Sequence, residues 1–272
     1  MPTNPAERPV TTHDLLARKR AGTPIVCVTA YDALFGRLVD EAGVDIVLVG
    51  DSLNQVLAGR ASTLSATLDQ MIYHGAMARR GVRRALLVVD MPFLTYQVSV
   101  EDAIRNCGRV MQETGASAVK LEGGTTVAAT VRAVVDAGIP VMGHVGFTPQ
   151  SEHALGGPRV QGRDAGGPAR LEADVRALEA AGAFAVVLEL VPAALAERLS
   201  RGLAVPTIGI GAGPGCDGQV LVLPDLLGLN EGFSPKFLKR YAGLAADVRT
   251  AVGAFADEVR RRAYPGPEHS FE

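Results

Sequence analysis

Residues 85–123 read ALLVVDMPFLTYQVSVEDAIRNCGRVMQETGASAVKLEG. The stretch begins and ends with short runs rich in Val, Leu and Ala, ALLVVD and AVKLEG, which have the length of buried strands. Between them, VEDAIRNCGRVMQETGA (100–116) has a helical pattern, with a Gly near its end where a helix stop is expected. Strand, helix and strand in this order predict a βαβ unit with parallel strands.

The same alternation continues along the chain. Amphipathic stretches at 31–43, 127–138 and 169–183 have helical patterns like that of 100–116. The runs that we interpret as strands are short, apolar and bounded by Gly, Pro or an acidic residue: 24–30, 45–50, 85–90, 118–123, 140–146, 185–190, 206–213 and 219–225.

Eight such units can form a closed barrel or an open, doubly wound sheet. A nucleotide-binding open sheet favours GxGxxG after the first strand, where this sequence has TAYDALFG. The later glycines Gly209, Gly211, Gly213 and Gly215 do not have that spacing either. We therefore predict an α/β fold, a (β/α)8 TIM barrel, as a single domain over residues 1–272.

Two extensions flank the predicted barrel. Residues 1–22 predict an added N-terminal helix, with Thr11 and Asp14 spaced as a capping pair and Gly22 as the stop. We expect this helix to cover the bottom of the barrel. Residues 235–272 predict C-terminal helices and a tail, with two helical stretches that end at Tyr264 and Pro265.

Composition excludes several classes of protein. The net charge of −2 and the lack of basic clusters interleaved with aromatic residues argue against a nucleic-acid partner. No apolar run approaches the roughly 20 residues that cross a bilayer, so we expect no membrane partner. The N-terminus lacks the apolar region of a signal peptide, and three cysteines without CxxC spacing, Cys27, Cys107 and Cys216, fit reduced thiols. We predict a cytoplasmic protein.

Charged residues follow the predicted strands, at the end where each strand stops. In a parallel barrel these ends open onto one face, where the βα loops meet and active sites form. Side chains from the second to the sixth strand would therefore converge there: Asp51, Ser52, Asp90, Lys120, Glu122, His144 and Glu189.

Each carboxylate has an alternative interpretation, because an Asp after a strand often caps the next helix. Four carboxylates that converge without a cation would repel one another in a partly desolvated pocket. A hard divalent cation with oxygen ligands relieves this repulsion, and magnesium fits better than zinc because one His and distant cysteines make a poor zinc site.

Lys120 and His144 are the other candidates. Lys120 stands two residues before Glu122, so both side chains point to the same side of the strand, and its ammonium could pair with a substrate carboxylate or an enolate oxygen. His144 lies between Gly143 and Gly146 and is either a substrate-binding or a structural residue. A cation on carboxylates, an ammonium and one further carboxylate fit the enolisation of a 2-oxo acid.

The sequence resembles the ketopantoate hydroxymethyltransferase family. The most specific matching stretches are VGDSL (49–53), VKLEGG (119–124), GHVGFTPQS (143–151) and IGIGAG (208–213). Shorter matches, from TAYD (29–32) to YPGPEHSF (264–271), extend the resemblance in order across nearly the whole chain.

The resemblance implies an enzyme of pantothenate biosynthesis. A hydroxymethyl group would pass from 5,10-methylenetetrahydrofolate to 3-methyl-2-oxobutanoate through a magnesium-stabilised enolate, giving 2-dehydropantoate. It also implies a homo-oligomer, often a decamer. The residue roles that it implies are Asp51, Asp90 and Glu122 on Mg2+, with Glu122 directly or through water, Asp51, Ser52, Asp90 and Lys120 on the oxo acid, and Glu189 as proton acceptor at C3.

Two alternatives remain at this point. Lyases and mutases of the isocitrate lyase and phosphoenolpyruvate mutase type also use magnesium and an oxo-acid enolate in a barrel, but their KKCGH-like loop is absent here. A barrel that only binds a keto acid or folate as a sensor is the other alternative. Loss of a ligand or of the base would favour the sensor, yet every candidate residue is present.

Overall fold

The computed structural model describes residues 8–271, and eight strands in that range close into one barrel. All neighbouring strands are parallel, and β1 pairs with β8, which excludes the open sheet. The predicted TIM barrel is confirmed. Its strands are β1 (Ile25–Thr29), β2 (Ile46–Val49), β3 (Leu86–Asp90), β4 (Ala118–Glu122), β5 (Val141–Gly146), β6 (Ala185–Glu189), β7 (Thr207–Ile210) and β8 (Gly218–Leu221).

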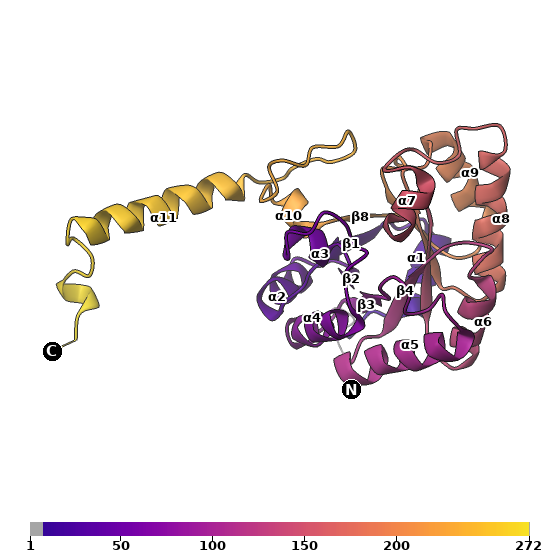
Figure 1. The fold of residues 1–272 in the computed structure, drawn as a ribbon, viewed down its shortest axis with the longest axis horizontal. Helices are drawn as coiled ribbons and strands as arrows, with labels where there is room; N and C mark the ends of the chain where they lie inside the picture. Colours follow the sequence, from indigo (N-terminus) through magenta and orange to yellow (C-terminus); the bar gives the residue numbers. More distant parts are fainter. Residues whose placement is uncertain (1–7, 272) are drawn as a thin grey trace. The chain divides into compact units, whose positions relative to one another are not determined.

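Helices cover the outside of the barrel (Figure 1). Successive long helices pack side by side in chain order, from α2 against α4 through to α8 against α9. The helices between strands are α2 (Ala33–Glu41), α3 (Leu53–Val56), α4 (Leu68–Gly81), α5 (Val100–Thr114), α6 (Ala128–Asp136), η1 (Pro149–Ser151), α7 (Glu152–Leu155), α8 (Gly167–Ala180) and α9 (Ala193–Gly202).

The connection from β7 to β8 departs from the expected pattern. Residues 211–217 join these strands without a helix, so the barrel has one fewer crossover helix than eight regular βα units would have. Gly211 and Gly213 there have positive φ angles of 63° and 77°, which lets the glycine-rich chain turn back within a few residues.

The helix α1 (Thr12–Ala21) lies at the amino ends of the strands. Its capping box forms as predicted, with Thr11 and Asp14 as partners, and Gly22 closes it in the left-handed conformation. Arg18 pairs with Asp45, just before β2, at 2.8 Å, while Lys19 pairs at 2.6 Å with an Asp just before β8. The helix therefore covers the bottom of the barrel. The first seven residues of the predicted extension lie outside the described residues.

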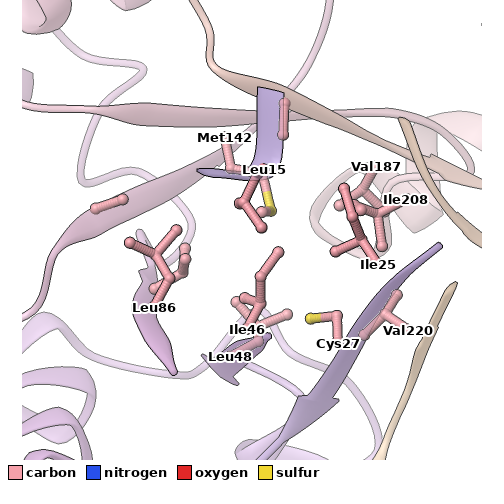
Figure 2. Packing of buried hydrophobic residues seen from close by; sticks show 13 residues of the cluster. Leu15, Ile25, Cys27, Ile46, Leu48, Leu86, Met142, Val187, Ile208 and Val220 are labelled. Atoms are coloured by element: carbon pink, nitrogen blue, oxygen red, sulfur yellow. The ribbon is translucent and has the colours of Figure 1, made fainter. Parts of the chain in front are cut away.

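The core fills the inside of the barrel. Side chains at positions i and i+2 of a strand lie on the same side, so each strand sends alternate residues inward. Figure 2 shows them pointing toward a common centre, where Leu15 of α1 joins them. The cluster consists of Leu15, Ile25, Cys27, Ile46, Leu48, Leu86, Val88, Ala118, Met142, Ala185, Val187, Ile208 and Val220.

The chain divides into two compact units, Met1–Val222 with the barrel and Leu223–Glu272. The second unit contains α10 (Leu223–Leu226), α11 (Leu244–Arg260) and the short turn η2 (Pro267–His269). C-terminal helices are thus present, but α11 is the one α-helix among the described residues after Pro235, where we expected two. The single domain over residues 1–272 stays a prediction. No helix within residues 8–271 is long and apolar enough to span a membrane.

Candidate active site

The carboxyl ends of the strands carry charged side chains at positions that are apolar deeper in the barrel. Since alternate residues face inward, the core pattern continues upward into this charged layer. The sequence prediction that these residues converge is confirmed for the inward-facing members. Asp90, Lys120, His144 and Glu189 stand two residues after the core residues Val88, Ala118, Met142 and Val187, and Glu122 follows Lys120.

Lys120 lies at the centre of this layer and is 4% exposed. Its Nζ is 2.6 Å from Oδ1 of Asp90 and 3.7 Å from Oε1 of Glu122. Burial alone would lower the pKa of Lys120, but the carboxylates of Asp90, Glu122 and Asp51 outweigh burial and raise it. Lys120 therefore remains an ammonium ion inside the barrel, in the anionic surroundings that the sequence predicts.

Glu122 and His144 form a buried pair beside Lys120. Nδ1 of His144 is 3.2 Å from Oε1 of Glu122. Burial and Lys120 would lower the pKa of His144, but Glu122 and Glu189 raise it to about 9. Burial would raise the pKa of Glu122, yet His144 and Lys120 hold it below its usual range. The imidazole is accordingly a cation at neutral pH.

Glu189 lies beyond His144 at the end of β6. Its Oε2 is 3.2 Å from Nε2 of His144, without the alignment of a hydrogen bond. The Glu189 side chain is 17% exposed, whereas His144 and Glu122 are almost fully buried. Glu189 is thus the carboxylate of the layer that a molecule arriving from solvent can reach.

Gly146 fixes the backbone next to Glu189. It has a φ of 95°, and a Cβ added there would lie 2.2 Å from the backbone oxygen of Glu189. The amide of Phe147 donates to the same oxygen at 2.8 Å. Gly146 therefore reflects close backbone packing, because a side chain there would push β5 and β6 apart. At Gly143, by contrast, an added Cβ would meet the Leu178 side chain of α8.

Asp51 and Ser52 directly follow β2. The interpretation of Asp51 as a helix cap is wrong, since its carboxylate accepts from Nε2 of Gln150 at 2.9 Å. The next residue, Ser52, makes no cap hydrogen bond to α3 either. The amide of Asp51 donates to Oδ2 of Asp90 at 3.0 Å, which places the ends of β2 and β3 together. The Ser52 hydroxyl is 2.9 Å from the Tyr31 hydroxyl.

Asp90 and Glu189 are not caps either. The helix after β3 is capped by Ser99, whose side chain accepts from Asp102, and the helix after β6 starts at Pro192 without a side-chain cap. Both carboxylates are therefore available for the chemistry at the carboxyl ends of the strands.

Two polar residues of the site were not predicted from the sequence. Gln150 of η1 is 5% exposed and contacts both Asp51 and Glu122. Tyr96, from the loop after β3, is 1% exposed, and its hydroxyl accepts from the amide of Glu122 at 3.1 Å. Both are uncharged at neutral pH, so a search for converging charges passes over them. Gln150 does fall within the stretch GHVGFTPQS, which could have indicated it.

The electrostatics of the site favour an additional cation. The carboxylates Asp51, Asp90, Glu122 and Glu189 outnumber the cationic side chains of Lys120 and His144. Burial, then Asp90 and Glu122, raise the pKa of Asp51 well above its usual range, and burial likewise raises that of Asp90. Any cation that arrives between these two carboxylates would keep both ionised.

The donor set fits magnesium held by two carboxylates. No three His, Cys, Asp or Glu side chains within residues 8–271 are already arranged around one metal position. Magnesium needs fewer protein ligands than this, because it keeps several waters and often binds to one or two carboxylates plus substrate oxygens. Oδ1 of Asp90 is buried and, apart from its ion pair with Lys120 at 2.6 Å, has no hydrogen-bond partner among the residues that the structure describes. Both oxygens of Glu122 are engaged, which suits contact through water.

Comparison with known sequences assigns the chain. A sequence profile described as ketopantoate hydroxymethyltransferase matches residues 9–267. The chain belongs to this family. The 3-methyl-2-oxobutanoate hydroxymethyltransferase of Pelobacter propionicus is 55% identical over 96% of this chain and 97% of its own length. The enzyme of the same name from Moorella thermoacetica is 55% identical over 97% of this chain and 98% of its own length. The prediction of a hydroxymethyltransferase enzyme is confirmed.

Solved structures share the barrel at much lower sequence identity. Phosphonopyruvate hydrolase in complex with oxalate and Mg++ has a TM-score of 0.61 at 14% identity, covering 96% of this chain and 93% of its own. A 2,3-dimethylmalate lyase of the PEP mutase/isocitrate lyase superfamily has a TM-score of 0.61 at 19% identity, covering 97% and 90%. These similarities show the fold alone. The alternative of a lyase or mutase therefore receives no support beyond the shared architecture.

Proposed function

We propose that this enzyme transfers the one-carbon unit of 5,10-methylenetetrahydrofolate to 3-methyl-2-oxobutanoate as a hydroxymethyl group, through a magnesium-stabilised enolate. Water supplies the hydroxyl oxygen, tetrahydrofolate is released, and the product is 2-dehydropantoate for pantothenate biosynthesis. Membership of the family supports the transfer to the oxo acid. The observation that carries the mechanism is the charged layer, in which buried carboxylates surround Lys120 at the mouth of a closed barrel.

Asp51 and Asp90 would hold the magnesium ion, with Glu122 reaching it through water. When bound there, magnesium would polarise the keto and carboxylate oxygens of the oxo acid and lower the pKa of its C3–H bond. The chain itself supplies two buried carboxylates that repel each other. Binding of a cation between them would remove this repulsion and is therefore favoured.

Lys120, Ser52, Asp51 and Asp90 are proposed to bind the oxo acid. The Lys120 ammonium is fixed by Asp90 at 2.6 Å, so it can face an anionic oxygen of the substrate without first reorganising. The Ser52 hydroxyl is hydrogen-bonded to the Tyr31 hydroxyl. When Tyr31 is the donor in that bond, Ser52 can donate its own proton to the oxo acid. Direct contact of His144 with the substrate, predicted from the sequence, remains part of this proposal.

Glu189 is proposed to accept the proton from C3. It is the most exposed carboxylate of the layer, so a substrate that arrives from solvent can reach it. Nε2 of His144 lies 3.2 Å from Oε2 of Glu189, while Nδ1 of His144 faces Glu122. A base held in this way contributes about 10²–10⁴-fold to the rate of proton transfer.

The enzyme is further proposed to be a cytoplasmic homo-oligomer, with the decamer as the expected form. The three cysteines are unpaired, as expected in a reducing compartment. In the second unit, α11 exposes Val248, Val252, Phe255 and Val259, which lie on one side of the helix at spacings of three and four residues. Such an apolar stripe is typical of a surface that another protein subunit covers.

The decisive experiment is proton exchange at C3 of 3-methyl-2-oxobutanoate in deuterated water, followed by NMR. Wild type should exchange the proton only with magnesium, and Glu189→Gln should lose exchange while still binding the oxo acid. Adding 5,10-methylenetetrahydrofolate to wild type should then give 2-dehydropantoate. Folded, magnesium-loaded wild type that shows no exchange, with or without folate, would reject this enolate mechanism.

A further inference from the structure

Gln150 connects the ends of four neighbouring strands at the charged layer. It comes from η1, just after β5, and its side chain and backbone contact residues that follow or end β2, β3 and β4. We infer that Gln150 is the positioning residue of the cation site, holding Asp51 and Glu122 in the arrangement that binds the metal. This inference rests on the proposed function, because it assumes that Asp51 binds magnesium.

The side-chain amide nitrogen of Gln150 donates both of its hydrogens to hydrogen bonds. Its Nε2 donates to Oδ2 of Asp51 and to the backbone oxygen of Met91, both at 2.9 Å. An amide nitrogen has two hydrogens, so both are engaged. One hydrogen bond to Oδ2 fixes the rotation of the Asp51 carboxylate, so its other oxygen keeps one direction relative to Asp90.

Tyr96 fixes which way the Gln150 amide faces. The Tyr96 hydroxyl accepts from the amide of Glu122 at 3.1 Å and therefore has its own proton left to donate. Oε1 of Gln150 lies 2.7 Å from that hydroxyl, closer than the backbone oxygen of Glu122 at 3.1 Å. With Oε1 as acceptor from Tyr96, Nε2 must point to Asp51.

The backbone of Gln150 holds the third carboxylate. Its amide donates to Oε2 of Glu122 at 3.0 Å, while Oε1 of Glu122 faces His144. Both Asp51 and Glu122 are thus anchored by the same residue, one through its side chain and the other through its backbone N–H. A shift of η1 would move two of the three carboxylates that surround Lys120.

The chemical type of the side chain matters as well. An amide donates hydrogen bonds to carboxylates without bringing positive charge, whereas Lys or Arg at this position would compete with the metal ion. A carboxylate here would lose both donors and add repulsion next to Asp51. Residues that orient metal ligands in this way typically change metal affinity or activity by about 10–100-fold when they are mutated.

The test measures Mn2+ binding to the full-length enzyme by electron paramagnetic resonance of the free ion, with no oxo acid present. Gln150→Met keeps the side-chain volume but removes the donors, and it should weaken Mn2+ binding by about 10-fold or more. Tyr96→Phe, which removes only the group that orients the amide, should cause a smaller loss. Gln97→Met is the comparison variant: Gln97 donates a longer hydrogen bond, 3.3 Å, to Oε1 of Gln150, so its loss should weaken Mn2+ binding far less than Gln150→Met does.

A second readout separates positioning from a general structural role. In Gln150→Met the magnesium concentration for half-maximal activity should rise, while kcat at saturating magnesium returns close to the wild-type value. Thermal unfolding in EDTA checks that each variant folds. If Gln150→Met does not fold, the binding measurement on Tyr96→Phe tests the inference instead.

The outcomes distinguish the two proposals. Wild type that binds no Mn2+ would overturn the magnesium assignment and this inference together. Wild type that binds Mn2+ while folded Gln150→Met binds it equally well would overturn the inference about Gln150 and leave the proposed function intact. Loss of affinity in Gln97→Met equal to that in Gln150→Met would also overturn it.

Discussion

The lower and upper parts of the barrel interior are built from the same inward-facing positions but have opposite chemistry. On β5, Met142 lies in the apolar core, and His144, one inward position higher, lies between two carboxylates. On β4, Ala118 is likewise followed by Lys120. The lower layers stabilise the fold by excluding water, whereas the upper layer holds buried charges whose desolvation is unfavourable. Within a single strand, the lower inward-facing residues therefore stabilise the fold and the upper ones form the candidate active site.

Removing the central cation of the upper layer should have the largest effect. Lys120→Met leaves Asp90 and Glu122 without their ammonium partner, and breaking a buried ion pair typically costs about 3–5 kcal/mol of stability. We also expect kcat/KM to fall by about 10²–10³-fold, the usual effect of losing one electrostatic donor at a reacting centre. Urea unfolding and steady-state kinetics measure the two effects.

Added magnesium provides the control for Lys120→Met. A dication should relieve part of the repulsion that the variant creates, so magnesium should stabilise Lys120→Met more than it stabilises wild type. Equal stabilisation of both proteins would show that the carboxylates near Lys120 do not share a cation site.

A cavity in the lower layer should separate stability from activity. Met142→Ala removes a fully buried side chain from the core and should lower the free energy of unfolding by about 2–5 kcal/mol. At temperatures where the variant is folded, kcat should change little, because the Met142 side chain belongs to the apolar core cluster and carries no group that the proposed chemistry uses, although its backbone pairs with that of Lys120. A loss of kcat as large as that of Lys120→Met would remove the distinction between the layers.

The pH dependence of stability should report on His144. Its pKa in the folded protein is raised from the ordinary value to about 9, so its contribution is complete below about pH 6.5 and is lost as the pH rises through 9. The magnesium-free protein should therefore lose up to about 3 kcal/mol between these pH values. His144→Gln should remove this slope, and denaturation curves at pH 6.5, 8 and 9.5 compare the two proteins. A slope that persists in the variant would assign the titration to another group.

The smallest effect is expected at the bottom of the barrel. Thr11→Ala removes the side chain that caps α1, and the loss of such a cap typically costs about 1 kcal/mol. Activity should be unchanged, because α1 lies at the amino ends of the strands, away from the charged layer. Reduced activity at full folding would mean that the bottom helix influences the site, contrary to the comparison above.

The fold could be predicted from sequence because its signals are local. Each of the eight strands is a short apolar run, and all eight were placed correctly, although β8 ends at Leu221 and residues from Leu223 onward turn into α10. The sequence did not predict that the connection between β7 and β8 lacks a helix. A glycine-rich segment can either lead into a helix or turn directly into the next strand.

The charged layer could be predicted for a different reason. Parallel strands bring their carboxyl ends to one face, so Asp90, Lys120 and Glu122 could be placed together from their position in the chain alone. The roles of Gln150 and Tyr96 could not, although Gln150 falls within the stretch GHVGFTPQS, because these roles depend on hydrogen bonds between loops whose conformation the sequence pattern does not specify. Chemistry that depends on charge was visible in the sequence, and chemistry that depends on loop geometry was not.

The closure of the barrel has a consequence for how the chain folds. The first strand completes its pairing only with the last, as in the pair Val28 and Leu221, which are separated by most of the barrel sequence. Contacts of such long range form slowly. During synthesis, the edge of β1 that pairs with β8 therefore stays unpaired until β8 has left the ribosome. An unpaired strand edge favours association with other chains, so the newly made protein remains exposed to aggregation until its eighth strand has paired.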